Sequence, residues 1–282
     1  MNKSFFYPYN NNMFNNYNEA FTSVNSVRSS YKKFYNWYKN QNLIALNNKN
    51  ADAIKFIKNT GVTFNVYGEN ENKETFIPFD IIPRIITISE WNTIENGIKQ
   101  RVKAINCFLN DIYTEQKILK SKVIPLDLIK GNPAFMTEML NIRPSKGIYN
   151  HISGIDLIKT NKNEFYVLED NVRVPSGVSY MIENRDIMLN LFPELLSKYK
   201  IKDVRNYPKE LSRMLKKSSP RNTKNPKIVV LTPGIYNSAY FEHAFLADQL
   251  GVELVEGKDL SVRNDYLNMK TINGWEKIDI IY

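Results

Sequence analysis

The longest periodic stretch of the chain covers residues 89–113, where hydrophobic residues recur at intervals of three and four. That spacing puts apolar side chains on one face of an α-helix. Ser89 fits an N-cap, and Glu90 adds a favourable negative charge to the first turn. We therefore predict a long amphipathic helix beginning at Ser89, with Cys107 buried among apolar neighbours and unreactive. The apolar positions are Ile94, Ile98, Val102, Ile105, Phe108, Leu109 and Ile112.

Shorter helices and strands are predicted on either side of this helix. The helical spacings cover residues 31–38, 52–58, 133–140, 183–196 and 209–215. Alternation of apolar and polar residues over 61–68 predicts a strand, and two prolines favour an extended chain over 76–86. Residues 151–171 fit two strands joined by a polar turn at 159–163. The sequence up to about residue 218 therefore mixes helices with short strands.

The pattern changes after residue 226. Residues 227–234 form a nearly continuous apolar run, as in a buried parallel strand. A helix over 238–251 follows, with Ser238 as N-cap and Gly251 as its stop, and then a strand over 252–257. Two more strands are expected at 266–271 and 277–282. This order predicts a βαβ unit in an open α/β sheet, and hence a mixed α/β fold class.

The domain organisation follows from these changes in composition. Residues 1–20 are rich in Asn and Tyr without periodicity, and we expect a disordered arm. Residues 21–218 are predicted to form the first domain and residues 226–282 the second. The segment between them holds Ser, Pro, Asn and Lys and no large apolar residue, which is typical of a linker.

Charge and cysteine content restrict the class of protein. The chain of 282 residues has a formal net charge of +9. Its lysines are scattered, with no run of like charges, so we expect no nucleic-acid partner, although a basic nucleic-acid binder remains a third alternative. No apolar run is long enough for a membrane span, and the N-terminus lacks the pattern of a signal peptide. A single cysteine excludes an internal disulfide and favours a reducing, cytoplasmic location.

The first candidate site lies on the two strands of residues 151–171. Glu169 and Asn171 are two apart, so they face the same side of a strand, while Asp170 faces away. Asp156 lies on the partner strand, where it can come alongside. Two carboxylates and one amide oxygen form a hard, all-oxygen donor set of the kind that Mg²⁺ prefers. The alternative is an ordinary exposed hairpin face that carries acidic residues.

Polar residues after this hairpin extend the candidate site. The sequence Pro-Ser-Gly that includes Ser176 and Gly177 predicts a tight turn, whose hydroxyl or N–H groups can hold an anion. Arg173 and Arg185 can bind phosphate or carboxylate through two parallel hydrogen bonds. For either arginine the alternative is a surface salt bridge.

Two further pairs are candidates for substrate binding. Asn237 and Ser238 lie where the strand over 227–234 leads into the next helix, and ligands of open α/β sheets bind at such carboxyl ends. Gln100 and Arg101 lie within the long helix, as does Asn106, and can position a substrate. The alternative is that Gln100 and Arg101 pair with neighbouring parts of the chain.

The motifs together resemble the circularly permuted ATP-grasp family, the relatives of glutathionylspermidine synthase. The resemblance covers nearly the whole chain apart from about the first 20 residues. It rests on GVTFNVYG, PFDIIPRIITISEW, GIKQRVKAINCFLNDIY, HISGIDL, FYVLEDNVRVPSGVSYMIENR, VVLTPGIYNSAYFEHAFLADQLGVELVEGKDL and KIDIIY. It implies a partial ATP-grasp core followed by a Rossmann-like pre-ATP-grasp βαβ domain over residues 226–282.

The resemblance also implies an activity. Enzymes of this fold use ATP and Mg²⁺ to activate a small-molecule or peptide carboxylate as an acyl phosphate, which an amine then attacks. The magnesium set falls on Asp156, Glu169 and Asn171. The turn that follows looks like the phosphate or acceptor side, with catalytic roles for Arg173 and Ser176. Gly177 and Arg185 would contact the nucleotide, and Asn237 and Ser238 would face the acceptor.

One departure from the family pattern qualifies this expectation. Such proteins usually continue past the strand that matches KIDIIY, with a lysine and a glycine-rich loop that cover the nucleotide. We therefore expect a truncated chain that lacks the nucleotide lid, binds ATP weakly by itself and is completed by a separate chain. The alternative function is a non-catalytic ATP-grasp-derived module that binds a partner chain.

Overall fold

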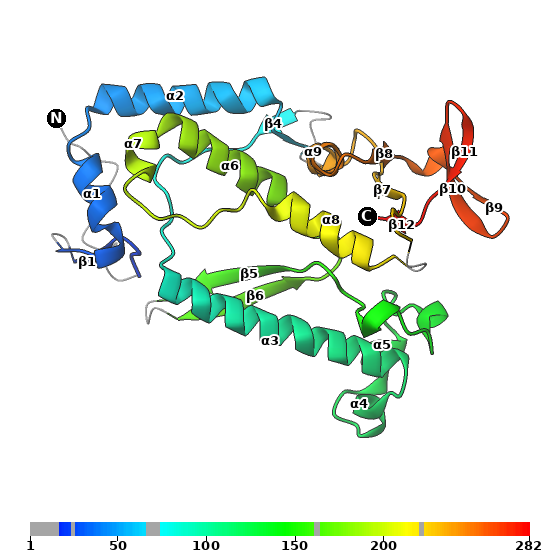
Figure 1. The fold of residues 1–282 in the computed structure, drawn as a ribbon. Coiled ribbons are helices and arrows are strands. Elements are labelled where there is room, and N and C mark those ends of the chain that lie inside the picture. The colour runs from blue at the N-terminus through cyan, green and yellow to red at the C-terminus, as the bar shows by residue number, and fades with distance from the viewer. Residues whose placement is uncertain (1–16, 24–25, 66–73, 161–163, 220–222) are drawn as a thin grey trace. The chain divides into compact units, whose positions relative to one another are not determined.

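The structure is a computed structural model that describes residues 17–23, 26–65, 74–160, 164–219 and 223–282. The chain forms two compact units (Figure 1). The first unit combines residues 1–85 with residues 176–282, and the second covers residues 86–175. Most of the predicted arm over residues 1–20 lies outside the described residues. The predicted linker at 218–226 lies within the first unit, and the predicted division into two domains stays a prediction.

Helices from distant parts of the sequence build the core of the first unit. The aromatic residues Phe34, Trp37 and Tyr38 lie on one face of a single helix and are buried against Phe192 and Leu195. Trp37 and Phe192 meet edge to face with ring centroids 5.8 Å apart. The helices are α1 (Lys32–Tyr38), α2 (Leu43–Thr60), α6 (Val178–Leu191), α7 (Pro193–Leu196) and α8 (Tyr207–Lys217).

Local signals set the bounds of these helices. The side chain of Asn42 caps α2, and Gly61 ends it in the left-handed conformation. The predicted helix over 183–196 begins earlier, at Val178, and is interrupted at Phe192, because Pro193 starts a new helix. Two small antiparallel pairs complete this part: β1 (Phe21–Ser23) with β2 (Ser26–Val27), and β3 (Thr63–Asn65) with β4 (Glu74–Phe76).

The end of the first unit contains the predicted βαβ unit. Strand β7 (Ile228–Leu231) is followed by α9 (Tyr240–Leu250) and by β8 (Glu253–Val255), which pairs parallel to β7. Strand β12 (Ile280–Ile281) pairs parallel on the other side of β7. The βαβ prediction is confirmed, and Gly251 ends α9 as expected. Ser238 is not the N-cap, because α9 begins two residues later, after Ala239. A Rossmann-like domain stays a prediction.

Between β8 and β12 in the sequence, the chain forms a three-stranded antiparallel sheet, which was predicted only in part. It consists of β9 (Leu260–Arg263), β10 (Tyr266–Thr271) and β11 (Gly274–Lys277). The strand predicted over 266–271 is confirmed. The strand predicted over 277–282 is wrong in its start, because Lys277 ends β11 and the pairing with β7 begins at Ile280. Residues 264 and 265 both have positive φ, as a two-residue hairpin turn of type I′ requires.

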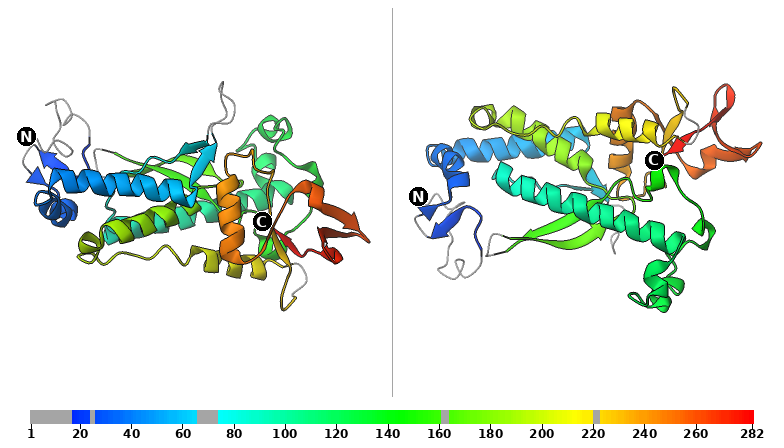
Figure 2. Two further views of the ribbon diagram at one scale, coloured as in Figure 1. Left: turned by 90° about the horizontal axis from the view of Figure 1, so that it is seen from above. Right: turned by 60° about the horizontal axis from the view of Figure 1, so that its bottom comes forward.

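The second unit consists of a long helix and a β-hairpin, which lie side by side in Figures 1 and 2. The helix is α3 (Ile88–Tyr113), and the strands are β5 (Gly154–Lys159) and β6 (Phe165–Asn171). Between them are α4 (Lys117–Lys120), α5 (Leu126–Lys130) and two 3₁₀ turns at Thr137–Met139 and Ser145–Gly147. The long helix and the hairpin are confirmed, and residues 161–163 of the predicted turn lie outside the described residues.

Three details of the second unit differ from the predictions. The N-cap of α3 is Thr87 and not Ser89, because Thr87 forms a reciprocal capping box with Glu90. The predicted helix over 133–140 is wrong, since only a single 3₁₀ turn forms there after Pro133. Cys107 is exposed and not buried, because it lies on the side of α3 that the unit leaves open. In the described part of the chain, no helix has both the length and the apolar character to cross a membrane.

Candidate functional site

The β5–β6 hairpin brings together the three predicted magnesium ligands. Asp156 on β5 is paired directly with Glu169 on β6, and Gly154 is paired with Asn171. Side chains alternate along a strand, so Asp156, Glu169 and Asn171 share one face. Asp156 and Glu169 are exposed, and Asn171 is half-buried. We call this surface the acidic face of the hairpin.

A β-bulge adjoins the acidic pair. The register shifts by one residue after Asp156, because Leu157 pairs with Val167 and leaves Leu168 without a partner position. Leu168, Tyr166 and Ile158 are exposed next to the acidic pair, with 67%, 52% and 45% of their surfaces accessible. The acidic face therefore combines two carboxylates and an amide with an apolar strip.

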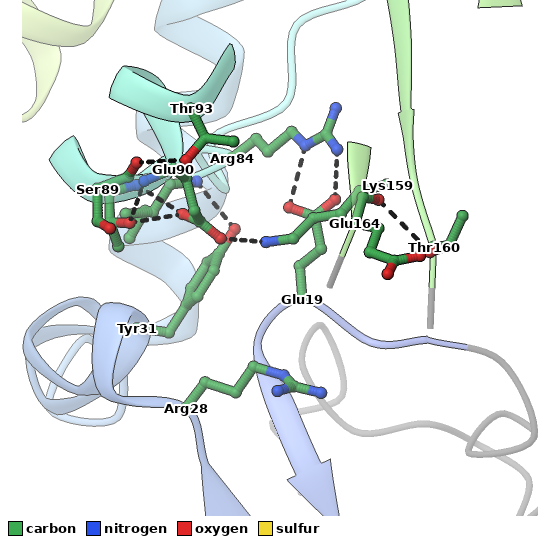
Figure 3. Close-up of polar contacts among 12 residues, drawn as sticks. Glu19, Arg28, Tyr31, Arg84, Ser89, Glu90, Thr93, Lys159, Thr160 and Glu164 are labelled. Carbon is green, nitrogen blue, oxygen red and sulfur yellow. Dashed lines mark hydrogen bonds and ion pairs between the residues drawn. The ribbon is translucent and has the colours of Figure 1, made fainter. Parts of the chain in front are cut away.

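The opposite face of the hairpin is bound to α3 by two ion pairs. Lys159 Nζ lies 2.5 Å from Glu90 Oε1, as Figure 3 shows, and both side chains are largely buried. Arg101 binds Asp170 through two hydrogen bonds of 2.6 Å. This pair holds the pKa of Asp170 below its ordinary value, chiefly through the hydrogen bonds from Arg101. These contacts fix which face of the hairpin is covered.

Arg101 is therefore a structural partner of Asp170 in this arrangement. Of the two alternatives for Arg101, pairing with neighbouring chain is the one observed. Gln100, the other member of the predicted pair, is exposed on α3. A substrate-binding role for either residue stays a prediction.

The segment that leads into β5 is held by two asparagines, in contacts that the sequence did not reveal. Asn106 on α3 accepts hydrogen bonds from the backbone N–H groups of Tyr149 and Asn150, at 2.8 and 2.9 Å. Asn150 is buried and donates to the carbonyl oxygen of Val172, just after β6. The two asparagines thus tie both ends of the hairpin to α3. Their only signal in the sequence is that both are short side chains able to bond the backbone.

The turn after β6 contains an unusual backbone conformation. Val174 has φ of +47°, which is rare for a β-branched residue. Proline follows it and disfavours helical conformations at that position as well. Such strain persists only where surrounding contacts impose it, and it is concentrated at functional sites. The turn carries Arg173, which is exposed.

Gly154 allows this turn to pack on β5. A Cβ at position 154 would lie 2.8 Å from Cβ of Pro175, closer than such atoms approach. We expect Gly154→Ala to displace the turn and to lower the free energy of unfolding of the second unit by about 1–3 kcal/mol. Urea denaturation followed by circular dichroism measures the change.

Gly97 provides a control of opposite sign for this prediction. It lies inside α3, and a Cβ there would meet nothing within 4 Å. Gly97→Ala should therefore stabilise the protein by about 0.5–1 kcal/mol. If both variants changed stability in the same direction, the close contact between Gly154 and Pro175 would not be the constraint.

In the first unit, Glu242 occupies the anion position that the sequence suggested near Gly177. Its Oε2 atom accepts hydrogen bonds from Gly177 N at 2.7 Å, Ser179 N at 3.0 Å and Ser179 Oγ at 2.7 Å. Glu242 is 3% exposed, and Ser179 is fully buried. Helix α6 has no capping side chain of its own, so this carboxylate from α9 caps it. A nucleotide contact by Gly177 stays a prediction.

The buried carboxylate of Glu242 affects the pKa of three tyrosines. Burial raises the pKa of Tyr180 and of Tyr207, and the charge of Glu242 raises it further. Burial also raises the pKa of Tyr282 strongly, with additional effects from Tyr207 and Glu242. These shifts keep all three phenols neutral.

The remaining predicted residues of the first unit lie around the contact between α6 and α9. Ser176 is exposed, immediately before the residues that Glu242 binds. Asn237 Oδ1 accepts a hydrogen bond from Ala239 N, and Ser238 is half-buried, both just before α9. Arg185 on α6 donates to the carbonyl oxygen of Lys202. The two predicted pairs, Ser176 with Gly177 and Asn237 with Ser238, therefore precede the two helices that Glu242 joins.

The donor set of the acidic face suits a hard cation. Asp156 and Glu169 contribute carboxylate oxygens and Asn171 an amide oxygen, the ligand types of Mg²⁺. Among the residues that the structure describes, no group of three or more His, Cys, Asp or Glu side chains could hold a metal ion. A cation on the acidic face would thus rely on two carboxylates, the amide, and oxygens from water or phosphate.

Comparison with known proteins identifies the family. A family model described as circularly permuted ATP-grasp type 2 matches residues 83–282. The chain belongs to this family. The match includes the hairpin with the acidic face, the α6–α9 contact and the βαβ unit. The closer likeness to glutathionylspermidine synthase stays a prediction.

Relatives of this ATP-grasp chain are longer proteins. An uncharacterized protein of Synechocystis sp. is 43% identical over 95% of this chain and 56% of its own length. One from Mycobacterium tuberculosis strain H37Rv is 43% identical over 94% of this chain and 48% of its own length. A Frankia casuarinae protein named "Putative glutamate--cysteine ligase 2-2" is 34% identical over 79% of this chain and 26% of its own length.

The chain thus spans about half the length of the first two relatives. The expectation of a truncated chain that lacks the nucleotide lid stays a prediction.

Proposed function

We propose that this ATP-grasp chain provides the magnesium-binding part of an ATP-dependent carboxylate–amine ligase. The observation that carries the proposal is the pairing of Asp156 with Glu169 on the exposed acidic face, with Asn171 on the same side. Without a cation, two facing carboxylates would repel each other. The family match and the name of the Frankia relative support the reaction class.

In this proposal the acidic face holds Mg²⁺ and, through it, the phosphates of ATP. The ion would neutralise phosphate charge while the γ-phosphoryl group passes to a substrate carboxylate. Asp156, Glu169 and Asn171 hold the ion, and the apolar strip of Ile158, Tyr166 and Leu168 limits the access of water to it. Lys159 and Asp170 hold the hairpin against α3, so the ligands are fixed before the metal arrives.

The substrate side of the proposal rests on the family resemblance, taken residue by residue. Arg173 is an exposed cation suited to a phosphate or carboxylate, and Ser176 offers an exposed hydroxyl. Asn237 and Ser238 would face the amine acceptor, and Gly177 and Arg185 the nucleotide. The substrates are a small-molecule or peptide carboxylate and an amine, joined as an amide.

Paramagnetic broadening by Mn²⁺ tests the metal site without requiring activity. Mn²⁺ added with ATP should broaden the amide signals of β5 and β6 near Asp156 and Glu169. Asp156→Asn and Glu169→Gln should each weaken Mg-ATP binding by at least about tenfold, since a tenfold loss needs only 1.4 kcal/mol. Calorimetric titration with and without EDTA gives the affinities.

Glu164→Gln provides the matched control. Glu164 precedes β6 and binds Tyr166 at the end of the hairpin, so its substitution removes one negative charge from the same hairpin. Its effect on Mg-ATP affinity should stay within about twofold, as for a screened surface charge. If Asp156→Asn and Glu169→Gln bound Mg-ATP as well as Glu164→Gln does, the acidic face would not be the metal site.

A further inference from the structure

Figure 1 shows the antiparallel sheet of β9, β10 and β11. Its register places different kinds of side chain on its two faces. Leu260, Leu267 and Met269 share one face. Leu260 on β9 is paired with Met269 on β10, and Leu267 lies two residues before Met269 on the same strand. They pack against the core of the βαβ unit, including Val229 and Val255. These three apolar side chains anchor the sheet, and the other face is turned away from that core.

The other face carries cations and aromatic rings and no acidic residue. We call it the basic face, and its positions in the register are Ser261, Arg263, Tyr266, Asn268, Lys270, Trp275 and Lys277. Arg263 and Lys270 are exposed, and Tyr266 and Trp275 retain 46% and 38% of their surfaces. Three positive charges thus share one side of a small sheet whose strands are spaced about 4.8 Å apart.

The aromatic rings hold two of these cations in place. The guanidinium carbon of Arg263 lies 4.2 Å from the centroid of the Trp275 ring, and Lys277 Nζ lies 3.0 Å from that of Tyr266. Arg263 and Trp275 come from the two outer strands, so their contact crosses the central strand. Cation–π contacts of this kind restrict long, flexible side chains, which lowers the entropy lost when they bind a ligand.

The cations of the basic face differ from other cations of the same unit. Lys227 pairs with Glu253 and Glu276, and Lys258 pairs with Glu256. Within the described ranges, Arg263, Lys270 and Lys277 form no ion pair with a carboxylate. Their positive charge is therefore not paired with a carboxylate on this face, since Glu276 is paired with Met269 in the register and lies on the opposite face.

We propose that the basic face is a docking surface for an acidic polypeptide segment. Carboxylates of an extended peptide would meet Arg263, Lys270 and Lys277, and its backbone would run across the sheet between these cations. Arg263 is paired with Tyr266 and Lys277 with Asn268, so with Lys270 the three cations lie at levels two residues apart along β10. Alternate side chains of an extended peptide repeat at the same spacing of about 6.8 Å. Single-stranded nucleic acid fits less well, because bases stack on open ring faces and cations lie over both rings.

A binding measurement on the full chain tests the proposal. The probe is a fluorescein-labelled peptide of alternating Glu and Ser, with a Gln and Ser peptide as the neutral reference. Fluorescence anisotropy should show binding of the Glu peptide only. The triple variant Arg263→Gln, Lys270→Gln, Lys277→Gln should weaken it by at least about tenfold, while the matched triple variant Lys55→Gln, Lys209→Gln, Lys216→Gln changes it by less than about twofold.

Two further measurements distinguish docking on the basic face from diffuse attraction by the net charge. In the unmodified protein, the Glu peptide should shift the indole N–H signal of Trp275 among the three tryptophans, which requires no variant to fold. The charge-reversed variant Arg263→Glu, Lys270→Glu, Lys277→Glu should bind a Lys and Ser peptide instead.

Three outcomes would overturn the proposal. The first is equal loss of binding in both triple variants, which would mean diffuse attraction by the net charge. The second is an unmoved Trp275 signal at saturating peptide. The third is tighter binding of an oligothymidine of equal length through the same three cations, which would make the face a nucleic-acid surface.

Discussion

Replacement of Glu242 by alanine is expected to lower the free energy of unfolding of the first unit by about 3–5 kcal/mol. The substitution leaves the N–H groups of Gly177 and Ser179 and the Ser179 hydroxyl without their acceptor, at a position where Ser179 is fully buried. Each buried donor left unpaired costs about 1–3 kcal/mol. Urea denaturation followed by circular dichroism measures the loss, and hydrogen exchange at Gly177 and Ser179 should accelerate.

Two comparison variants show whether the effect belongs to the carboxylate. Glu242→Gln keeps one acceptor oxygen and most of the volume, so it should cost about 1–2 kcal/mol. Glu253→Ala removes an exposed carboxylate whose partner is Lys227, and it should cost less than about 1 kcal/mol. If Glu242→Ala were no more destabilising than Glu253→Ala, the carboxylate would not be what joins α9 to the start of α6.

Replacement of Lys159 by methionine is expected to destabilise the second unit by about 2–4 kcal/mol at neutral pH. Lys159 is 6% exposed and Glu90 17% exposed in their side chains, so the substitution leaves a largely buried carboxylate without its cation. The hairpin should then separate from α3 more readily. Hydrogen exchange of the β5 and β6 amides, read by mass spectrometry, measures the change.

The pH dependence of this effect has a definite sign. Burial raises the pKa of Glu90, but hydrogen bonds from Lys159 and Thr87 lower it by more, so its pKa lies below the ordinary 4.5. A lowered folded-state pKa gives stability that is complete above the unfolded value and lost as the pH falls through the folded value. The difference between the Lys159→Met variant and the unmodified protein should therefore shrink below pH 4.5.

An exposed pair on the same helix serves as the control for Lys159. Lys99 pairs with Glu95 one turn away, and its side chain is 69% exposed. Lys99→Met should cost about 0.3–0.5 kcal/mol. Equal effects of the two lysine substitutions would mean that the hairpin is held by other contacts.

The two predictions concern the parts of the chain that carry the proposed site residues. Lys159 and Glu90 fix the covered face of the β5–β6 hairpin, which leaves Asp156 and Glu169 together on the other face. Glu242 fixes the start of α6, directly after Ser176. Neither Glu242 nor Lys159 needs to contact a substrate to affect the site, because each positions the backbone that carries other residues.

The sequence by itself determined the features that depend on local periodicity and spacing. It predicted α3, the β5–β6 hairpin with Asp156 beside Glu169, and the βαβ unit, because residues two apart on a strand or three to four apart on a helix share a face. It also carried the family resemblance that the match over residues 83–282 confirmed. It misplaced the helix start at Ser89, because Thr87 and Ser89 are both good caps and only Thr87 completes the reciprocal bonds with Glu90.

Only the tertiary structure decided which polar residues bind one another over long distances in sequence. Glu242 caps a helix that begins at Val178, Arg101 binds Asp170, and Lys159 binds Glu90. No periodicity indicates such partners, since each pair depends on how two separately predicted elements pack. Cys107 was misjudged for the same reason. Local pattern specifies the faces of an element, and the packing of whole elements decides which of those faces is covered.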